Sequence, residues 1–237
     1  MGVVSALWRY PVKSMAGERL VAAEVEERGF AGDRRYAVRD PDGKFGSGKN
    51  TRRFRRMPGL NTFAARYDGA VPVVTPPGGR AVRGDAVHEE IAAALGRPGV
   101  ELVREAAIPH HDEAAVHLVT TSSLAWLAER APGTAIDARR LRPNILLDTG
   151  PAPELAEEAW LGERIRIGAV ELEILRKAVR CVMVDLPWDE LPAAPGLLKT
   201  ITGANGMTLG VHARVVRGGT LHVGAVQTVG CSTPHTP

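Results

Sequence analysis

One cysteine of the chain stands in a position that favours chemistry. Cys181 directly follows Arg180 and lies close to Lys177, between two apolar segments. A neighbouring cation favours the thiolate, which is the form of cysteine that acts as a nucleophile or a metal ligand. The same surroundings also suit a buried cysteine that packs as a small hydrophobic side chain. The local sequence leaves both interpretations open, and Cys231, near the C-terminus, has no such surroundings.

Basic and amide side chains stand in short motifs next to expected strands, with Lys13 and Ser14 after one strand and Arg142 and Asn144 before another. Lys13 and Ser14 place an ammonium beside a hydroxyl, a pair that can hold a phosphate oxygen. Arg142 offers a planar fork for a phosphate or a ring edge, and Asn144 can donate and accept at once. Arg34 follows a Gly-Asp pair in a similar way. Each motif, taken alone, also fits an ordinary solvated turn.

Several other site types are not supported by the sequence. His110, His111, Asp112 and His117 match no familiar zinc spacing, and adjacent residues of a strand point to opposite faces. We therefore expect no structural metal there. The chain has no P-loop, no dinucleotide-binding glycine motif after a strand and no nucleophile-elbow motif.

The elements that position these residues follow from composition. The 237 residues include 26 Gly and 17 Pro, which indicates many turns and short strands in one large or two small domains. No apolar run reaches the roughly 18–20 residues of a membrane helix, and the N-terminus lacks the pattern of a signal peptide. Two cysteines exclude a disulfide framework. We expect a cytoplasmic protein without a membrane partner.

The net charge of +3 is dispersed, apart from a basic run at Arg52, Arg53, Arg55 and Arg56. Nucleic-acid bases would need aromatic stacking partners, and only Phe54 interrupts this run. We therefore expect no nucleic-acid partner, and an anionic small ligand fits the charge equally well.

Most of the predicted elements are strands. Asp85 and Gly96 are expected to bound one helix, and a second helix is expected to begin at Thr121 or Ser122 and to end at Gly133. Gly203, Gly206 and Gly210 are interpreted as turn residues. Apolar or alternating segments predict strands at 3–12, 19–27, 34–45 (a hairpin), 62–68, 71–76, 101–105, 143–148, 164–168, 170–176, 181–186, 212–219 and 220–229, with a hairpin around Gly218-Gly219.

Many short strands with few helices predict a mainly β protein, of the α+β class, built from barrels or sandwiches. A charged stretch at 104–114 suggests a boundary there. We predict an N-terminal domain at 1–104, a second domain at 105–230 and a flexible tail at 231–237.

An ordered set of motifs carries a family resemblance. YPVKS, GDRRY, VTTSSL, RPN before an apolar strand, RCVMVD, LGVHARVV and GGTLHVGAVQ occur in this order between about Trp8 and Val226. The chain thereby resembles MOSC-domain proteins that carry an N-terminal MOSC β-barrel domain. It is similar to the catalytic part of the mitochondrial amidoxime-reducing component and its bacterial relatives.

The resemblance implies a molybdenum cofactor (molybdopterin) and the residues that hold it. Cys181 would be the molybdenum ligand, and Arg180 would orient it. His212 is a candidate acid, although an ordinary strand histidine fits as well. The cofactor-binding residues implied by the matched motifs are Lys13, Ser14, Arg34, Thr120, Ser123, Arg142, Asn144 and Arg180.

The activity implied is reduction of N-hydroxylated compounds, with electrons from a separate electron-transfer protein, because the chain has no cysteine set for an iron–sulfur cluster. Two alternatives stay open. The domain could carry the cofactor or a Cys181 persulfide, or it could be a metal-free pathway enzyme. Relatives often have a Cys or Ser before the Arg-Cys pair, where this chain has Ala178-Val179, so substrate choice is open.

Overall fold

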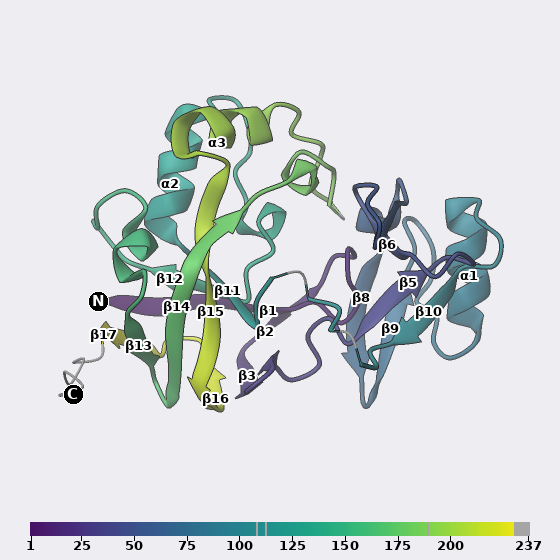
Figure 1. Ribbon diagram of the computed structural model, residues 1–237, viewed down its shortest axis with the longest axis horizontal. Coiled ribbons are helices and arrows are strands. Elements are labelled where there is room, and N and C mark those ends of the chain that lie inside the picture. The colour runs from purple at the N-terminus through teal and green to yellow at the C-terminus, as the bar shows by residue number, and fades with distance from the viewer. Residues whose placement is uncertain (108, 112, 189, 230–237) are drawn as a thin grey trace.

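Seven strands close into a barrel, which forms one lobe of the molecule (Figure 1). The computed structural model describes residues 1–107, 109–111, 113–188 and 190–229. Around the barrel the order is β12–β11–β15–β14–β13–β17–β1, and β1 pairs back with β12. These strands are β1 (Gly2–Arg9), β11 (Val116–Thr120), β12 (Ile145–Asp148), β13 (Arg164–Ile167), β14 (Val170–Val179), β15 (Thr208–Arg217) and β17 (Val226–Val229).

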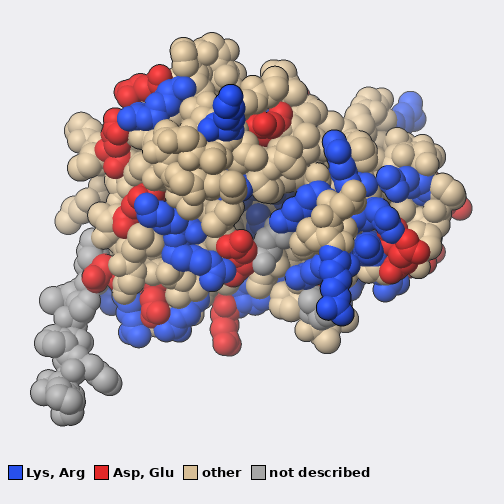
Figure 2. All heavy atoms as spheres, turned by 45° about the horizontal axis from the view of Figure 1, so that its top comes forward, with Lys and Arg blue, Asp and Glu red and all other residues tan. Residues whose placement is uncertain are grey.

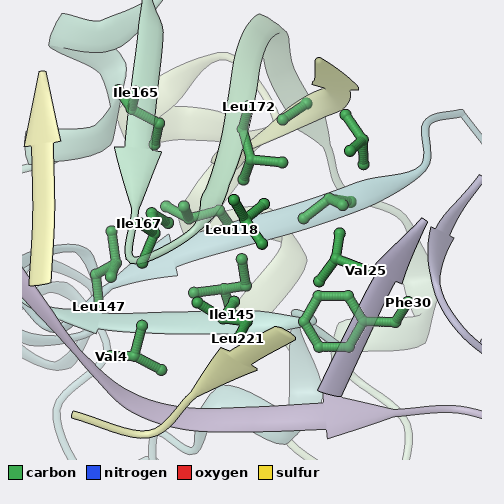
Figure 3. Close-up of a cluster of buried hydrophobic side chains, with 14 of the residues drawn as sticks. Val4, Val25, Phe30, Leu118, Ile145, Leu147, Ile165, Ile167, Leu172 and Leu221 are labelled. Atoms are coloured by element: carbon green, nitrogen blue, oxygen red, sulfur yellow. The ribbon is translucent and has the colours of Figure 1, made fainter. Parts of the chain in front are cut away.

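Alternating apolar residues fill the barrel. In β13 the two arginines are exposed while Ile165 and Ile167 are fully buried, as the period of two of a strand requires. Figure 3 shows these side chains with Leu118, Leu147 and Leu172 in one cluster. Burying each large aliphatic side chain contributes roughly 1.5–3 kcal/mol, so this cluster is the main source of the barrel's stability.

One polar side chain is buried on the barrel strand β17. Gln227 is fully buried, and neither atom of its amide has a hydrogen-bond partner among the described residues. A buried amide without partners costs about 1–3 kcal/mol. We expect Gln227→Met, which keeps the length of the side chain, to raise the free energy of unfolding by about 1 kcal/mol in urea titrations. Gln227→Ala, which opens a cavity, should lower it; a Met variant less stable than the parent would contradict this prediction.

The second lobe carries two small sheets and a helix around its own core. Its sheets have the orders β10–β5–β6–β7 and β8–β9. Val38, Phe63, Val74 and Ile91 are buried in one cluster between them. The elements are β5 (Tyr36–Arg39), β6 (Phe45–Ser47), β7 (Phe54–Arg56), η1 (Leu60–Thr62), β8 (Ala64–Asp68), β9 (Val71–Thr75), α1 (Ala86–Leu95) and β10 (Glu101–Arg104).

Short elements complete both lobes. Strand β2 (Glu18–Leu20) pairs with β1 at the edge of the barrel. A small sheet contains β3 (Ala22–Glu26), β4 (Gly29–Phe30) and β16 (Gly219–His222). The helices of the barrel lobe are α2 (Thr121–Arg130), η2 (Ala138–Arg140), η3 (Ala156–Trp160), η4 (Val182–Val184) and α3 (Leu197–Asn205). No helix in the described part of the chain is long and apolar enough to cross a membrane.

The predicted fold class is confirmed: the chain is mainly β with a few helices and contains a barrel. Helix α1 begins after Asp85 and ends at Gly96, which is left-handed as predicted. The boundary at 104/105 stays a prediction. The strand pairings nevertheless place β1, from the start of the chain, in the barrel with strands that follow residue 115. The predicted tail, 231–237, lies outside the described residues.

The second predicted helix is present as α2, but its expected bounds are wrong, and so are some other elements. Thr120 caps α2, not Thr121 or Ser122, and the helix ends at Arg130, before Gly133. Gly203, expected in a turn, lies inside helix α3. No atom of another segment lies within 4 Å of the place where a side chain would stand there, so the residue faces open space.

The segment 181–186, predicted as a strand, turns instead into η4. The Val184 amide donates to the Cys181 carbonyl (3.1 Å), and the Asp185 carboxylate accepts from the Leu198 amide (2.7 Å). These two bonds bend the chain away from the sheet. The predicted hairpin around Gly218-Gly219 is also wrong, because β16 pairs with β3. A side chain at residue 218 would overlap the Val25 carbonyl, so glycine permits this close pairing.

Candidate functional site

A cleft between the two lobes collects most of the predicted site residues. Eight of the ten line it: Lys13, Ser14, Arg34, Arg142, Asn144, Arg180, Cys181 and His212. They come from both lobes and from distant parts of the chain. Figure 2 shows Lys and Arg side chains gathered beside a hollow in the middle of one face.

Cys181 stands on the barrel side of the cleft, where β14 has ended and η4 begins. Cys181 is partly exposed and lines the cleft. Arg180, just before it, is fastened at two points: its backbone amide donates to the Met207 carbonyl (2.8 Å) and its Nη2 donates to the Leu141 carbonyl (2.7 Å). The thiol therefore faces the cleft from a fixed turn, with a guanidinium beside it.

His117 supports this arrangement from β11, although the sequence analysis considered it only as a metal ligand. Its Nδ1 lies 3.3 Å from the Arg142 carbonyl and its Nε2 lies 3.3 Å from Arg180 Nη1. Burial and then the charge of Arg180 hold the pKa of His117 well below its usual range, so the ring is neutral. A neutral ring that donates from Nδ1 to the carbonyl accepts at Nε2, which fits a bond from Arg180.

The turn at Arg142 and Asn144 is held by aromatic rings and by β-strand neighbours. The Arg142 guanidinium lies 4.2 Å from the ring centre of Tyr10 and 4.8 Å from that of Trp188, and it donates to the Met15 carbonyl. The buried Asn144 amide accepts from the His117 backbone (3.1 Å) and donates to the Trp8 carbonyl (3.3 Å).

The other lobe contributes Lys13, Ser14 and Arg34. Lys13 Nζ donates to the His110 carbonyl (3.1 Å) and the Ser14 hydroxyl donates to the Gly46 carbonyl (3.1 Å). Arg34 pairs with Asp33 and donates to the Arg142 carbonyl (3.3 Å). This last bond joins the two walls of the cleft.

Several residues of the cleft have an unusual backbone conformation. Among the described residues, five that are not glycine have a positive φ: Ser14 (65°), Arg34 (49°), Arg142 (56°), Leu155 (54°) and Met207 (68°). Three of them line the cleft. Such conformations cost free energy and cluster at functional sites. The strain therefore supports a binding role for these three positions.

His212 faces the cleft from β15. Its Nδ1 lies 3.4 Å from a carboxylate oxygen of Glu113, and its ring packs edge-on against His117 at 5.3 Å between centres. The geometry is compatible with the predicted role of His212 as an acid, which stays a prediction.

Thr120 and Ser123 do not line the cleft. Both hydroxyls donate to the carboxylate of Glu157, which is fully buried under the start of α2. Burial raises the pKa of Glu157 despite these bonds. The side chain of Thr120 also caps α2 by accepting from the Ser123 amide (3.2 Å). Through these contacts both residues stabilise the start of α2 and the buried Glu157, apart from the eight predicted site residues that line the cleft.

The placement of Ser123 leads to a prediction. Ser123→Ala removes one donor from a buried carboxyl and should lower the free energy of unfolding by about 1–3 kcal/mol. Because the residue lies away from the cleft, the molybdenum content of the folded variant should equal that of the parent. Urea unfolding and metal analysis of the same preparation test both statements. A stable variant with little molybdenum would restore the family-based assignment.

Sequence reasoning missed several residues of the cleft. Ser47, Lys49, Glu113, Arg140 and Met183 line it as well. The Gly-Ser-Gly-Lys stretch at 46–49 was a usable signal, because small residues before a cation suit close contact with a ligand. The others carry no local signal, since surface Glu, Arg and Met are common.

The charge of the lining is strongly one-sided. It includes six cationic side chains and, among the described residues, a single carboxylate, Glu113. The cations are Lys13, Arg34, Lys49, Arg140, Arg142 and Arg180. No group of three or more His, Cys, Asp or Glu in the described ranges could hold a metal by itself. The cleft is thus built for an anionic ligand beside one thiol.

Comparisons with known proteins agree with this description. The MOSC domain model matches residues 105–227, and the MOSC N-terminal beta barrel domain model matches residues 1–121. No curated protein matches the sequence significantly.

Among solved structures, the YuaD protein from Bacillus subtilis has 13% identity and a TM-score of 0.52, covering 95% of this chain and 93% of its own. A hypothetical protein has 11% identity and a TM-score of 0.50, covering 97% of this chain and 68% of its own. YiiM from Geobacillus stearothermophilus has 19% identity and a TM-score of 0.40 over 50% of this chain and 55% of its own.

The first two likenesses support the fold. Each of the two family models spans about half of the chain, and together they run from residue 1 to residue 227. The chain belongs to the MOSC-domain family and carries the N-terminal MOSC β-barrel domain in front of the MOSC domain.

Proposed function

We propose that the protein is a molybdenum-cofactor-dependent oxidoreductase that removes oxygen from N-hydroxylated compounds. One observation carries the proposal: a partly exposed thiol, Cys181, opens into a cleft whose lining has six cations and, in the described structure, one carboxylate. A pterin phosphate is anionic, and a thiolate is a good ligand for a soft metal centre. The donor set therefore fits this cofactor.

The residues would divide the work between them. Lys13, Ser14, Arg34 and Arg142 supply cations and a hydroxyl for the phosphate and the pterin, and Cys181 supplies the thiolate to the metal. Arg180, held by Leu141 and His117, keeps a positive charge beside that thiolate. When bound, the cofactor supplies the two-electron redox chemistry.

The reaction has a simple balance. An amidoxime takes up two electrons and two protons, its N–O bond breaks, and an amidine and water leave. We assign one proton to the His212 ring, which lines the cleft and lies 3.4 Å from a carboxylate oxygen of Glu113. The electrons come from a separate redox protein, because two cysteines cannot hold an iron–sulfur cluster.

The test begins with protein purified from a host that makes the cofactor. We expect about one molybdenum per chain and conversion of benzamidoxime to benzamidine with reduced methyl viologen as donor. Cyanide-releasable sulfur without metal would instead favour a persulfide carrier at Cys181. Stoichiometric molybdenum without turnover of any N-hydroxylated compound would contradict the activity and leave a cofactor carrier.

A further inference from the structure

The loop after β6 brings one lysine to the thiol end of the cleft. Ser47 ends β6, and Gly48 then packs so closely against Met183 that a side chain at residue 48 would overlap its sulfur. Met183 is two residues beyond Cys181. Lys49, the next residue of the loop, lines the cleft. The approach of Gly48 to Met183 thereby places this loop beside the turn that carries the thiol.

Lys49 differs from the other cations of the lining. Lys13, Arg34, Arg140, Arg142 and Arg180 each have a carbonyl or carboxylate partner. Lys49 is exposed, and the described part of the chain gives its ammonium neither an acceptor nor a carboxylate. It has one neighbour of note, the ring of Phe54 at 5.6 Å. An exposed lysine beside a ring is available to a ligand at little desolvation cost.

Two large apolar side chains from the segment around the thiol line the cleft. Val179 is 53% exposed although it lines the cleft, and Met183 lines it as well. Val182, just after the thiol, is 38% exposed. Large aliphatic side chains left open around the thiol suit the apolar body of a small ligand. The thiol end of the cleft thus offers an apolar wall and one available cation.

We propose that Lys49 binds an anionic substituent of the substrate, so that the preferred substrates are N-hydroxylated compounds with an apolar body and a carboxylate. This inference rests on the proposed function for its chemistry. The carboxylate pairs with Lys49 while the ring or chain that bears it lies along Val179 and Met183.

The experiment compares three benzamidoximes that carry a 4-carboxylate, a 4-methyl or a 4-aminomethyl group. With reduced methyl viologen as donor, we expect kcat/KM of the parent holoprotein to be about tenfold higher for the carboxylate than for the methyl compound. Lys49→Met should bring this ratio close to one, and Lys49→Glu should favour the aminomethyl compound. Arg52→Met, which changes an exposed cation of the same segment outside the lining, should keep the ratio of the parent.

Direct binding separates this proposal from the proposed function. The affinity of the product analogue 4-carboxybenzamidine for the holoprotein, measured by calorimetry, should fall about tenfold in Lys49→Met even if no compound is turned over. Equal affinity and an equal ratio in parent and variant would overturn the proposal. Loss of molybdenum in Lys49→Met would also overturn it, because Lys49 would then hold the cofactor. A defect seen only with a protein electron donor would assign the segment to partner docking instead, and tight binding of an RNA or DNA oligomer there would assign it to nucleic acid.

Discussion

Cys181→Ala is expected to lose bound molybdenum and to reduce benzamidoxime no faster than the background. The cleft holds one described thiol, and no cluster of His, Cys, Asp or Glu in the described structure could replace it as a ligand. Without the thiolate, the metal would keep only the ligands of the cofactor itself. We expect turnover to fall by a factor of at least about 1,000, since the lost group contacts the reacting centre.

Two controls accompany this variant: replacement of the other cysteine, and a measurement of the variant's free energy of unfolding. Cys231→Ala should match the parent in metal and activity. Because Cys181 is partly exposed, its replacement should change the free energy of unfolding by less than about 1 kcal/mol, which shows that any loss is local. Equal molybdenum in the parent and in Cys181→Ala would rule out this residue as the ligand.

Acid is expected to unfold the protein through the segment that joins the lobes. Glu105, just after β10, pairs with Arg28 and Arg35 and accepts from the His110 amide (2.7 Å). Burial opposes its ionisation, but these bonds and charges outweigh burial and lower the pKa of Glu105 to about 2. Burial also lowers the pKa of the His110 ring to about 4.

Both groups destabilise the fold as pH falls. The usual pKa of a histidine ring is 6.5, so between about pH 6.5 and pH 4 His110 takes up a proton more readily in the unfolded chain than in the folded one. The folded protein therefore loses stability as pH falls through this range. Glu105 has a lowered pKa, so its contribution is complete above about pH 4.5 and is lost as pH falls toward 2. The losses of stability over these two pH ranges add. Glu105 alone should contribute about 2 kcal/mol to the free energy of unfolding at neutral pH, after allowance for screening by solvent.

Glu105→Gln tests this assignment by urea unfolding at pH 7, 5, 4 and 3. At pH 7 the variant should be less stable than the parent by about 2 kcal/mol, and the difference should shrink below pH 4.5 as the parent loses its own ionised pair. A difference that stays constant with pH would contradict the role of the charge. Since the His110 carbonyl holds Lys13, the variant should also bind the cofactor more weakly.

The sequence predicted the mainly β class and eight residues of the cleft, and the reasons are physical. Lys13 follows β1, Arg142 precedes β12 and Cys181 follows β14, and the ends of strands are where side chains leave the sheet for a site. Each of these residue types alone also fits an ordinary turn, so the ordered motifs of the family resemblance were needed to select them. Thr120 and Ser123 have an equally plausible type and position, yet their direction is decided by Glu157, which is distant in sequence and becomes a partner only after folding.

The errors in the expected elements have a similar origin. The strand expected at 181–186 is bent by a contact between Asp185 and the start of α3, and the hairpin expected at Gly218 is replaced by pairing with β3. The secondary-structure propensities of these residues carry no information about either contact. The Gly-Ser-Gly-Lys stretch before and including Lys49 is a signal in the sequence, but the approach of Gly48 to Met183, which places this lysine beside the thiol, forms only on folding.

The closure of the barrel by β1 has a consequence for how the protein is made. Gly2 pairs with Gln227 and Leu7 with Ile145, so β1 is synthesised long before the strands that pair with it. Contacts between residues so far apart in the sequence close slowly, because loop entropy is lost before they form. Until then β1, with Val4, Ala6 and Leu7 destined for burial, is an open apolar edge. Nascent chains should therefore depend on chaperones that shield this strand, and soluble yield should rise more from slower expression or added chaperone than from further stabilisation of the finished barrel.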